Sequence, residues 1–177
     1  MVSLELVFDD ETDSAVRAEW DALLRAGLPS QARHRGESNR PHITILVRAE
    51  LAPFDAAPLE DAFPLDLRLG APVLFGRGRN RVIARSVVPT ERLLSLHARV
   101  HQLAGPGADV DQTVPGAWTA HVTLARRVPL ERLGDALSVL EERGGEDLAA
   151  RAVGIRRWDA ATKTVTELVG RGTLEQC

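Results

Sequence analysis

The chain has 177 residues, which is enough for one domain with a substantial core or for two small lobes that share one. Apolar residues make up 44% and charged residues 27%, and the net charge of −3 argues against a chain that binds nucleic acid through an overall positive charge. No apolar run approaches the roughly 18 residues that span a bilayer. The first residues lack the basic flank of a signal peptide, and the single cysteine, Cys177, has no partner within the chain. These features predict a cytoplasmic globular protein with no membrane segment.

The first half of the chain predicts strands and helices separated by polar loops. Val16, Trp20 and Leu23 recur at helical spacing, and Gly27 with Pro29 would end that helix. Apolar residues alternate with polar ones in the later strands. The expected order is a strand at 3–8, a helix at 12–26, a loop at 28–40, a strand at 42–47, a short helix at 54–62, strands within 65–75 and a hairpin turn at 76–80.

The second half repeats much of this order. The expected elements are a strand at 81–88, a helix at 90–104, a loop at 105–116, a strand at 118–126, a helix from Pro129 to the glycines at 144 and 145, and strands at 151–158 and 164–170. The repeat-like rhythm predicts an α+β fold in which one domain, residues 1–177, has two similar lobes of antiparallel sheet with helices packed outside them.

Two short segments share the pattern His, apolar, Thr, apolar: His42-Ile43-Thr44-Ile45 and His121-Val122-Thr123-Leu124. Both lie in β-branched runs that favour strands. Because alternate side chains of a strand point the same way, each histidine shares a face with its threonine, while the apolar residues can enter the core. If the two strands meet across a cleft, two imidazoles and two hydroxyls converge on one small site.

Phosphodiester chemistry can use such a site. A neutral imidazole accepts a proton from the attacking water or hydroxyl, and a protonated imidazole donates one to the leaving oxygen. The threonine hydroxyls can bind the phosphoryl oxygens, and the scheme needs no metal ion or other cofactor. A single His-x-Thr in a strand is more often a packed or surface histidine, but two copies with apolar neighbours rarely arise by chance.

The sequences Pro-His-Ile-Thr-Ile-Leu at 41–46 and Ala-His-Val-Thr-Leu-Ala-Arg at 120–126 resemble the paired motifs of the 2H phosphoesterase superfamily. They are especially similar to its 2′-5′ RNA ligase, or RNA 2′,3′-cyclic phosphodiesterase, branch. The resemblance implies two pseudo-symmetric lobes around a central cleft and hydrolysis of a 2′,3′-cyclic phosphate that leaves a 2′-phosphate. It implies that His42, Thr44, His121 and Thr123 are catalytic, with His121 as base and His42 as acid.

Three further residues are candidates for substrate binding. Strand alternation would put Arg48 and Arg127 on the faces of the two His-Thr pairs, and His34 lies in the loop before the first motif. A solvated strand end explains the two arginines equally well, and a solvated loop explains His34 better than substrate contact does. Arg126 is expected to point the other way unless the strand bends, and Trp118 is expected to pack in the core.

Several alternatives stay open at this point. His97 and His101 have the i, i+4 spacing of a helical metal pair, but no third ligand is evident, so no metal is expected. The expected partner is an RNA terminus or a small cyclic-phosphate nucleotide, and no pattern indicates an oligomeric state. The same cleft could also join RNA ends as a 2′-5′ RNA ligase, or bind nucleotides without catalysis.

Overall fold

The computed structural model describes residues 1–36, 38–143 and 147–170. Within these residues the chain forms seven β-strands and three α-helices, joined by loops with short 3₁₀ turns. The strands are β1 (Val2–Phe8), β2 (His42–Arg48), β3 (Leu65–Phe75), β4 (Asn80–Val87), β5 (His121–Pro129), β6 (Leu148–Asp159) and β7 (Thr164–Gly170). The helices are α1 (Asp10–Arg25), α2 (Glu91–Leu103) and α3 (Leu133–Glu142).

Most elements lie where the sequence predicts them, and the differences are at their ends. Helix α1 begins at Asp10 because the side chain of Asp9 accepts a hydrogen bond from the Thr12 amide and so caps the first turn. It ends at Arg25, before Gly27, whose φ of 69° favours glycine. The predicted short helix at 54–62 is a 3₁₀ segment, Ala57–Ala62. The glycines at 144 and 145 and Cys177 lie outside the described residues.

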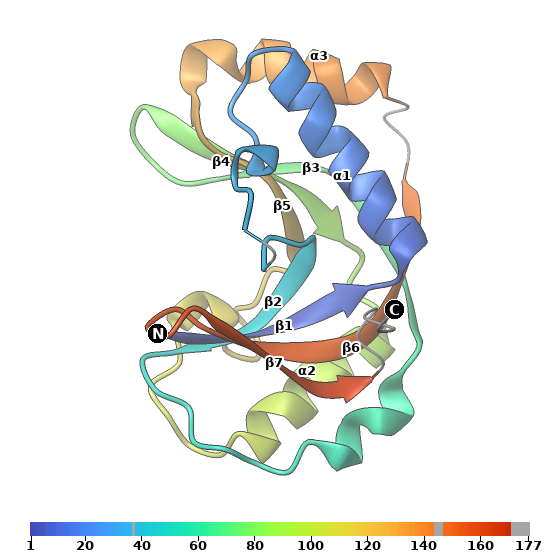
Figure 1. The fold of residues 1–177 in the computed structure, drawn as a ribbon, viewed down its shortest axis with the longest axis vertical. Coiled ribbons are helices and arrows are strands. Elements are labelled where there is room, and N and C mark those ends of the chain that lie inside the picture. The colour runs from blue at the N-terminus through green and yellow to red at the C-terminus, as the bar shows by residue number, and fades with distance from the viewer. Residues whose placement is uncertain (37, 144–146, 171–177) are drawn as a thin grey trace.

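All strand pairs are antiparallel, and β6 joins two groups of strands. Its first part, Leu148–Ala152, pairs with β3, and its later part, Ala152–Asp159, pairs with β1, with β7 along its other edge. The first lobe therefore has the strand order β2-β1-β6-β7, and the second lobe has the order β5-β4-β3-β6. The lobes also touch at one bridge between β2 and β5, Ile43↔Val122. The predicted α+β fold with two lobes of antiparallel sheet is confirmed (Figure 1).

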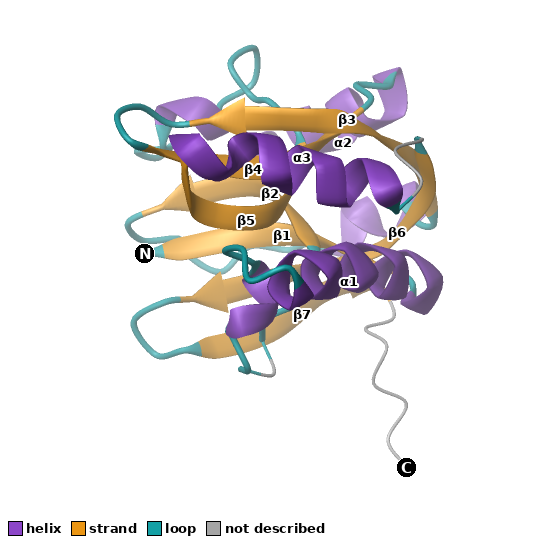
Figure 2. Ribbon diagram, turned by 90° about the horizontal axis from the view of Figure 1, so that it is seen from above, coloured by secondary structure: helices purple, strands orange, loops and turns teal. Residues whose placement is uncertain are grey.

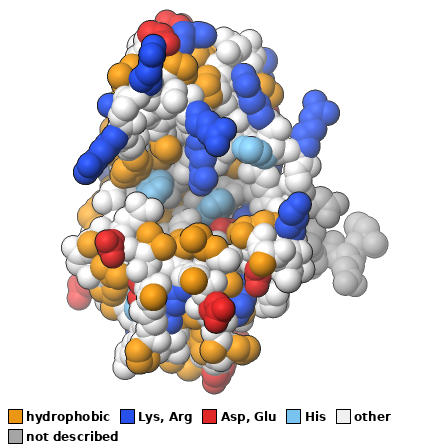
Figure 3. All heavy atoms as spheres, turned by 90° about the vertical axis from the view of Figure 1, so that its left-hand side faces the viewer, with side chains coloured by type: hydrophobic (Ala, Val, Ile, Leu, Met, Phe, Trp, Pro, Cys, Tyr) orange, Lys and Arg blue, Asp and Glu red, His pale blue; other side chains and the backbone are white. Residues whose placement is uncertain are grey.

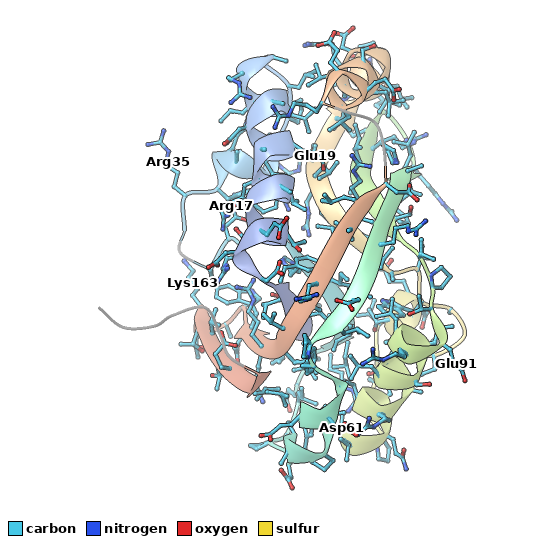
Figure 4. All side chains as sticks on the ribbon, turned by 90° about the vertical axis from the view of Figure 1, so that its right-hand side faces the viewer. Arg17, Glu19, Arg35, Asp61, Glu91 and Lys163 are labelled. Atoms are coloured by element: carbon cyan, nitrogen blue, oxygen red, sulfur yellow. The ribbon has the colours of Figure 1, made fainter. Side chains whose placement is uncertain are left out.

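The helices cover the outer faces of the sheets, and α1 covers the lobe that does not contain the preceding strand, β1. Helix α1 follows β1 but packs beside α3 on the second lobe, as Figures 1 and 2 show. Glu19 of α1 faces the strands of that lobe (Figure 4) and forms a buried ion pair with Arg85 of β4. Helix α2 packs against β2 of the first lobe. In the described part of the chain no helix is long and apolar enough to cross a bilayer.

Candidate active site

The bridge between β2 and β5 brings the two motifs together. Ile43 and Val122 pair across this bridge, and both are fully buried. Carrying the antiparallel register one residue in each direction puts His42 opposite Thr123 and Thr44 opposite His121. Because Ile43 and Val122 point into the core, all four polar side chains share the opposite face, and each is only partly buried. The crossing of the two lobes therefore gathers two imidazoles and two hydroxyls.

Each histidine ring is oriented by a backbone carbonyl two residues upstream. Nδ1 of His42 lies 2.6 Å from the Arg40 carbonyl oxygen, and Nδ1 of His121 lies 2.7 Å from that of Thr119. A carbonyl oxygen can only accept, so Nδ1 must carry the hydrogen in both rings. In each ring Nε2 is therefore the nitrogen that can take up or release a proton.

The two histidines have different surroundings. His121 lies against the ring of Phe75, with ring centroids 4.6 Å apart. Burial lowers the pKa of His121 below its ordinary value; the Thr119 hydrogen bond opposes this, and the positive charges of His42 and Arg126 add to it. Nε2 of His42 instead lies 3.7 Å from a carboxylate oxygen of Glu5 on β1.

A cavity of about 570 Å³ opens beside the motifs. It is lined by His121 and both motif threonines, by residues of the β3–β4 hairpin, and by the segment that precedes β5. A second hollow of about 370 Å³ is lined by His42, Glu5, Arg156 and the loop before β2, so His42 lines this hollow and not the larger cavity. Figure 3 shows histidine side chains in the hollow between the lobes, with Lys and Arg side chains gathered on the lobe above it. The site has room for a nucleotide-sized ligand.

A β-bulge in β2 makes the expectation for Arg48 wrong. Glu5 pairs with Thr44 and Leu4 with Leu46, so one residue of β2 has no counterpart on β1 and the alternation shifts. Arg48 consequently turns away from the cavity and is 4% exposed. Its guanidinium donates to Asp109, 2.5 Å away, and to the carbonyls of Ala104 and Gly105. Arg48 thus holds the loop after α2 in place and does not reach the site.

A matching bulge in β5 exchanges the roles expected for Arg126 and Arg127. Ala84 pairs with Thr123 and Ile83 with Ala125, which leaves Leu124 as the extra residue. Arg126 therefore lines the cavity. A second register shift follows between Ala125 and Val128, where Arg127 has a φ of 58° and is not part of the lining. In the same way, the bulge in β2 puts Val47 in the cavity lining. Strand alternation alone could not find Arg126, because it assumes an unbroken ladder.

Two tryptophans donate hydrogen bonds to the backbones of the motifs. The indole nitrogen of Trp20, on α1, donates to the Thr123 carbonyl at 3.0 Å, and that of Trp118 donates to the Thr44 carbonyl at 2.9 Å. Each carbonyl lies next to a bulge, where the strand ladder is interrupted. Trp118 packs against the core, as expected, and one of its faces stacks on the buried His97, at 3.9 Å between ring centroids. It also lines the cavity.

The remaining histidines separate into two groups. His34 lines the hollow on the His42 side, so its predicted position near the first motif agrees with the structure, although its role stays a prediction. His97 and His101 bond to the carbonyls of Thr113 and Ile45 and pack on each other. Among the described residues no group of three or more His, Cys, Asp or Glu side chains is arranged to hold a metal ion.

Comparisons with known proteins found similar solved structures. No curated protein matches it. Usb1 from Kluyveromyces marxianus has 13% identity and a TM-score of 0.48, over 94% of this chain and 95% of Usb1. The Usb1 structure with uridine monophosphate has 12% identity and a TM-score of 0.49, over 94% and 97%. The crystal structure of a phosphoesterase has 13% identity and a TM-score of 0.49, over 97% of this chain and 94% of that protein.

The family model of the 2′-5′ RNA ligase superfamily matches residues 56–167. The match covers more than half of the chain and includes the second His-x-Thr motif, while the first motif precedes it. The chain belongs to the 2′-5′ RNA ligase superfamily, a group of two-histidine phosphoesterases.

Proposed function

We propose that the protein is a phosphodiesterase that hydrolyses a 2′,3′-cyclic phosphate at an RNA end or on a small nucleotide. One observation carries the proposal: the β2–β5 bridge gathers His42, Thr44, His121 and Thr123 on one face, with both histidines oriented through Nδ1. This arrangement supplies two proton-transfer groups and two hydroxyl donors along the crossing of β2 and β5.

In the proposed reaction a water oxygen attacks phosphorus opposite the leaving ribose oxygen. Nε2 of His121 accepts a proton from the water, and Nε2–H of His42 donates a proton to the leaving oxygen as its bond to phosphorus breaks. The threonine hydroxyls and the Arg126 guanidinium bind the other phosphoryl oxygens and stabilise the charge that builds on them. If the 3′ oxygen leaves, the product is a 2′-phosphate. Proton exchange with solvent restores both rings.

The different surroundings of the two histidines support this assignment of base and acid. A base must be neutral before the reaction, and burial favours the neutral form of His121. An acid must be protonated, and His42 has a carboxylate 3.7 Å from its Nε2. Two histidines with such different neighbours can divide the roles of base and acid in this way.

The test is turnover of a short RNA that ends in a 2′,3′-cyclic phosphate, followed by ³¹P NMR in the presence of EDTA. We expect a single monoester product from the wild type. Because each proton transfer contributes roughly 10²–10⁴-fold, His42→Ala and His121→Ala should each lose about that much activity. Thr44→Val and Thr123→Val keep the side-chain shape without the hydroxyl and should also be slower.

Other outcomes would point elsewhere. Turnover that EDTA abolishes would contradict the two-histidine scheme. If neither the RNA nor small cyclic nucleotides react, but a nucleotide still binds in the cavity, the chain is a binding module. Joining of an added RNA with a free 5′ hydroxyl would show ligation, in which that hydroxyl replaces water as the nucleophile.

A further inference from the structure

Glu5 is a buried carboxylate whose position distinguishes His42 from His121. It lies in β1 between the core residues Leu4 and Leu6 and is 5% exposed. The bulge in β2 pairs Glu5 with Thr44, and one of its oxygens, Oε1, lies 3.7 Å from His42 Nε2. On β5, His121 instead faces the ring of Phe75.

The surroundings of Glu5 keep it ionised. Ser3 donates to Oε1 at 2.7 Å, and Arg156 of β6 pairs with Oε2 at 2.8 Å. Burial alone would raise the pKa of Glu5, but the charges of His42 and Arg156 and the hydrogen bonds from Ser3 and Arg156 outweigh it, so the pKa is lowered. The negative charge is therefore present wherever the enzyme could act near neutral pH.

The 3.7 Å separation suits an electrostatic role. It is longer than a hydrogen bond, so Nε2–H of His42 is not committed to Glu5 and can donate to a substrate oxygen. It is short enough for a carboxylate in a partly buried site to stabilise a positive charge on the ring. A direct hydrogen bond would compete with the substrate for the same proton.

Several other charged groups surround this corner of the site. Near it lie Arg156 on β6, His34 and Arg35 on the loop before β2, and His121 on β5, while the Arg40 side chain pairs with Asp13 of α1. Arg35 extends away from the body of the protein (Figure 4). Glu167 on β7 lies near Arg156 and Arg40. Of the described residues that line this hollow, Glu5 alone carries a carboxylate, so it is the described group that can stabilise a positive charge on the His42 ring.

We propose that Glu5 is a positioning residue that keeps the proton on His42 and thereby makes His42, and not His121, the general acid. The inference rests on the proposed function for its catalytic meaning. The electrostatic effect on His42 exists in the free protein as well, and it can be measured without any substrate.

The first measurement is the pH dependence of the His42 ring signals in the free protein by ¹H–¹⁵N NMR. We expect Glu5→Gln, which keeps the size and the Ser3 contact, to lower the protonated fraction of His42 at a fixed pH and to leave that of His121 unchanged. Glu167→Gln is the matched control, because it removes a carboxylate near Arg156 that is not among the residues lining the hollow beside His42, and it should match the wild type.

The second measurement is the pH profile of kcat/KM on the RNA cyclic phosphate. The acid must be protonated, so loss of the carboxylate should move the alkaline limb to lower pH by about one unit and leave the acid limb in place. At the alkaline end this shift is roughly a tenfold loss of rate, while KM stays within about twofold of the wild type.

Two results would overturn the inference. One is an unchanged protonated fraction of His42 in Glu5→Gln, in a variant whose circular dichroism spectrum shows it is folded. The other is an equal loss of rate at every pH with neither limb moved, which would indicate a structural role. A wild type without turnover would count against the proposed function alone, since the NMR comparison would still decide the role of Glu5.

Discussion

At the scale of single residues, small differences in surroundings separate side chains that look alike in the sequence. His42 and His121 lie in the same motif at the same strand position, and each ring donates from Nδ1 to the backbone carbonyl two residues upstream. One faces a carboxylate and the other an aromatic ring, which is the kind of contrast that divides acid from base. A charged residue inside an apolar run, as in Leu4-Glu5-Leu6, was the signal in the sequence that could have pointed to Glu5.

The neighbouring arginines Arg126 and Arg127 provide a matched test of substrate binding. Arg126 lines the cavity and Arg127 does not. Because a charge-assisted hydrogen bond contributes about 1.5–3 kcal/mol, Arg126→Ala should lower kcat/KM roughly 10- to 100-fold, and Arg127→Ala should stay within about twofold of the wild type. Steady-state kinetics on the cyclic-phosphate RNA measures both. Equal losses in the two variants would contradict the assignment of Arg126.

His97 should make the stability of the protein depend on pH. Burial, with the charge of His101, lowers the pKa of His97 to about 4 from an ordinary value of 6.5. Between these values the unfolded chain binds more protons, so the free energy of unfolding falls as the pH falls from 6.5 to 4, by up to about 3 kcal/mol. Urea unfolding across this range should show a flatter dependence for His97→Gln. A slope equal to that of the wild type would rule out His97 as the source.

At the scale of elements, the two bulges decide which side chains reach the site. Each adds one residue to a motif strand after the threonine, at Ile45 in β2 and Leu124 in β5. The shift brings Val47 and Arg126 to the cavity. It also turns Arg48 into the protein, where Arg48 forms an ion pair with Asp109. The tryptophan hydrogen bonds satisfy carbonyls beside these interruptions, so each bulge and its tryptophan form one local unit.

Trp20→Phe tests this unit in β5. Phenylalanine keeps most of the buried ring but cannot donate to the Thr123 carbonyl, which would lose its partner. An unsatisfied buried carbonyl costs about 1–3 kcal/mol, so the free energy of unfolding should fall by about that amount. Trp158→Phe is the control, since Trp158 is only partly buried and its indole makes no hydrogen bond within the described residues. Equal effects of the two substitutions on urea unfolding would argue against the hydrogen bond.

At the scale of the whole molecule, the two lobes are interlocked. Strand β6 belongs to both sheets, and α1 follows a strand of one lobe but packs on the other. The buried core residues also form one continuous cluster that includes residues of both lobes. An opening of one lobe would therefore expose apolar surface of the other.

This interlocking predicts one cooperative unfolding transition for the whole chain. Urea unfolding followed by far-ultraviolet circular dichroism and by tryptophan fluorescence should give coincident curves, because neither lobe keeps a complete core alone. The tryptophans report on different places, with Trp20 on α1 and Trp158 on β6. Two separate transitions would show instead that the lobes fold as independent units.

The sequence by itself determined the local parts of this protein. Apolar periodicity and capping or breaking residues located most helices and strands to within a few positions, because these signals act over one or two turns. The two His-x-Thr motifs identified the superfamily and the four candidate catalytic side chains, since residues two apart in a strand share a face wherever that strand lies.

Only the tertiary structure decided the rest, because the deciding contacts join residues far apart in the chain. The pairing of β1 with β2 and of β4 with β5 created the bulges that removed Arg48 and Arg127 from the site and admitted Arg126. The same pairing set Glu5 beside His42, a contact between strands that no spacing within one strand could predict. Strand alternation describes a single regular ladder, and here the partner strands interrupted it.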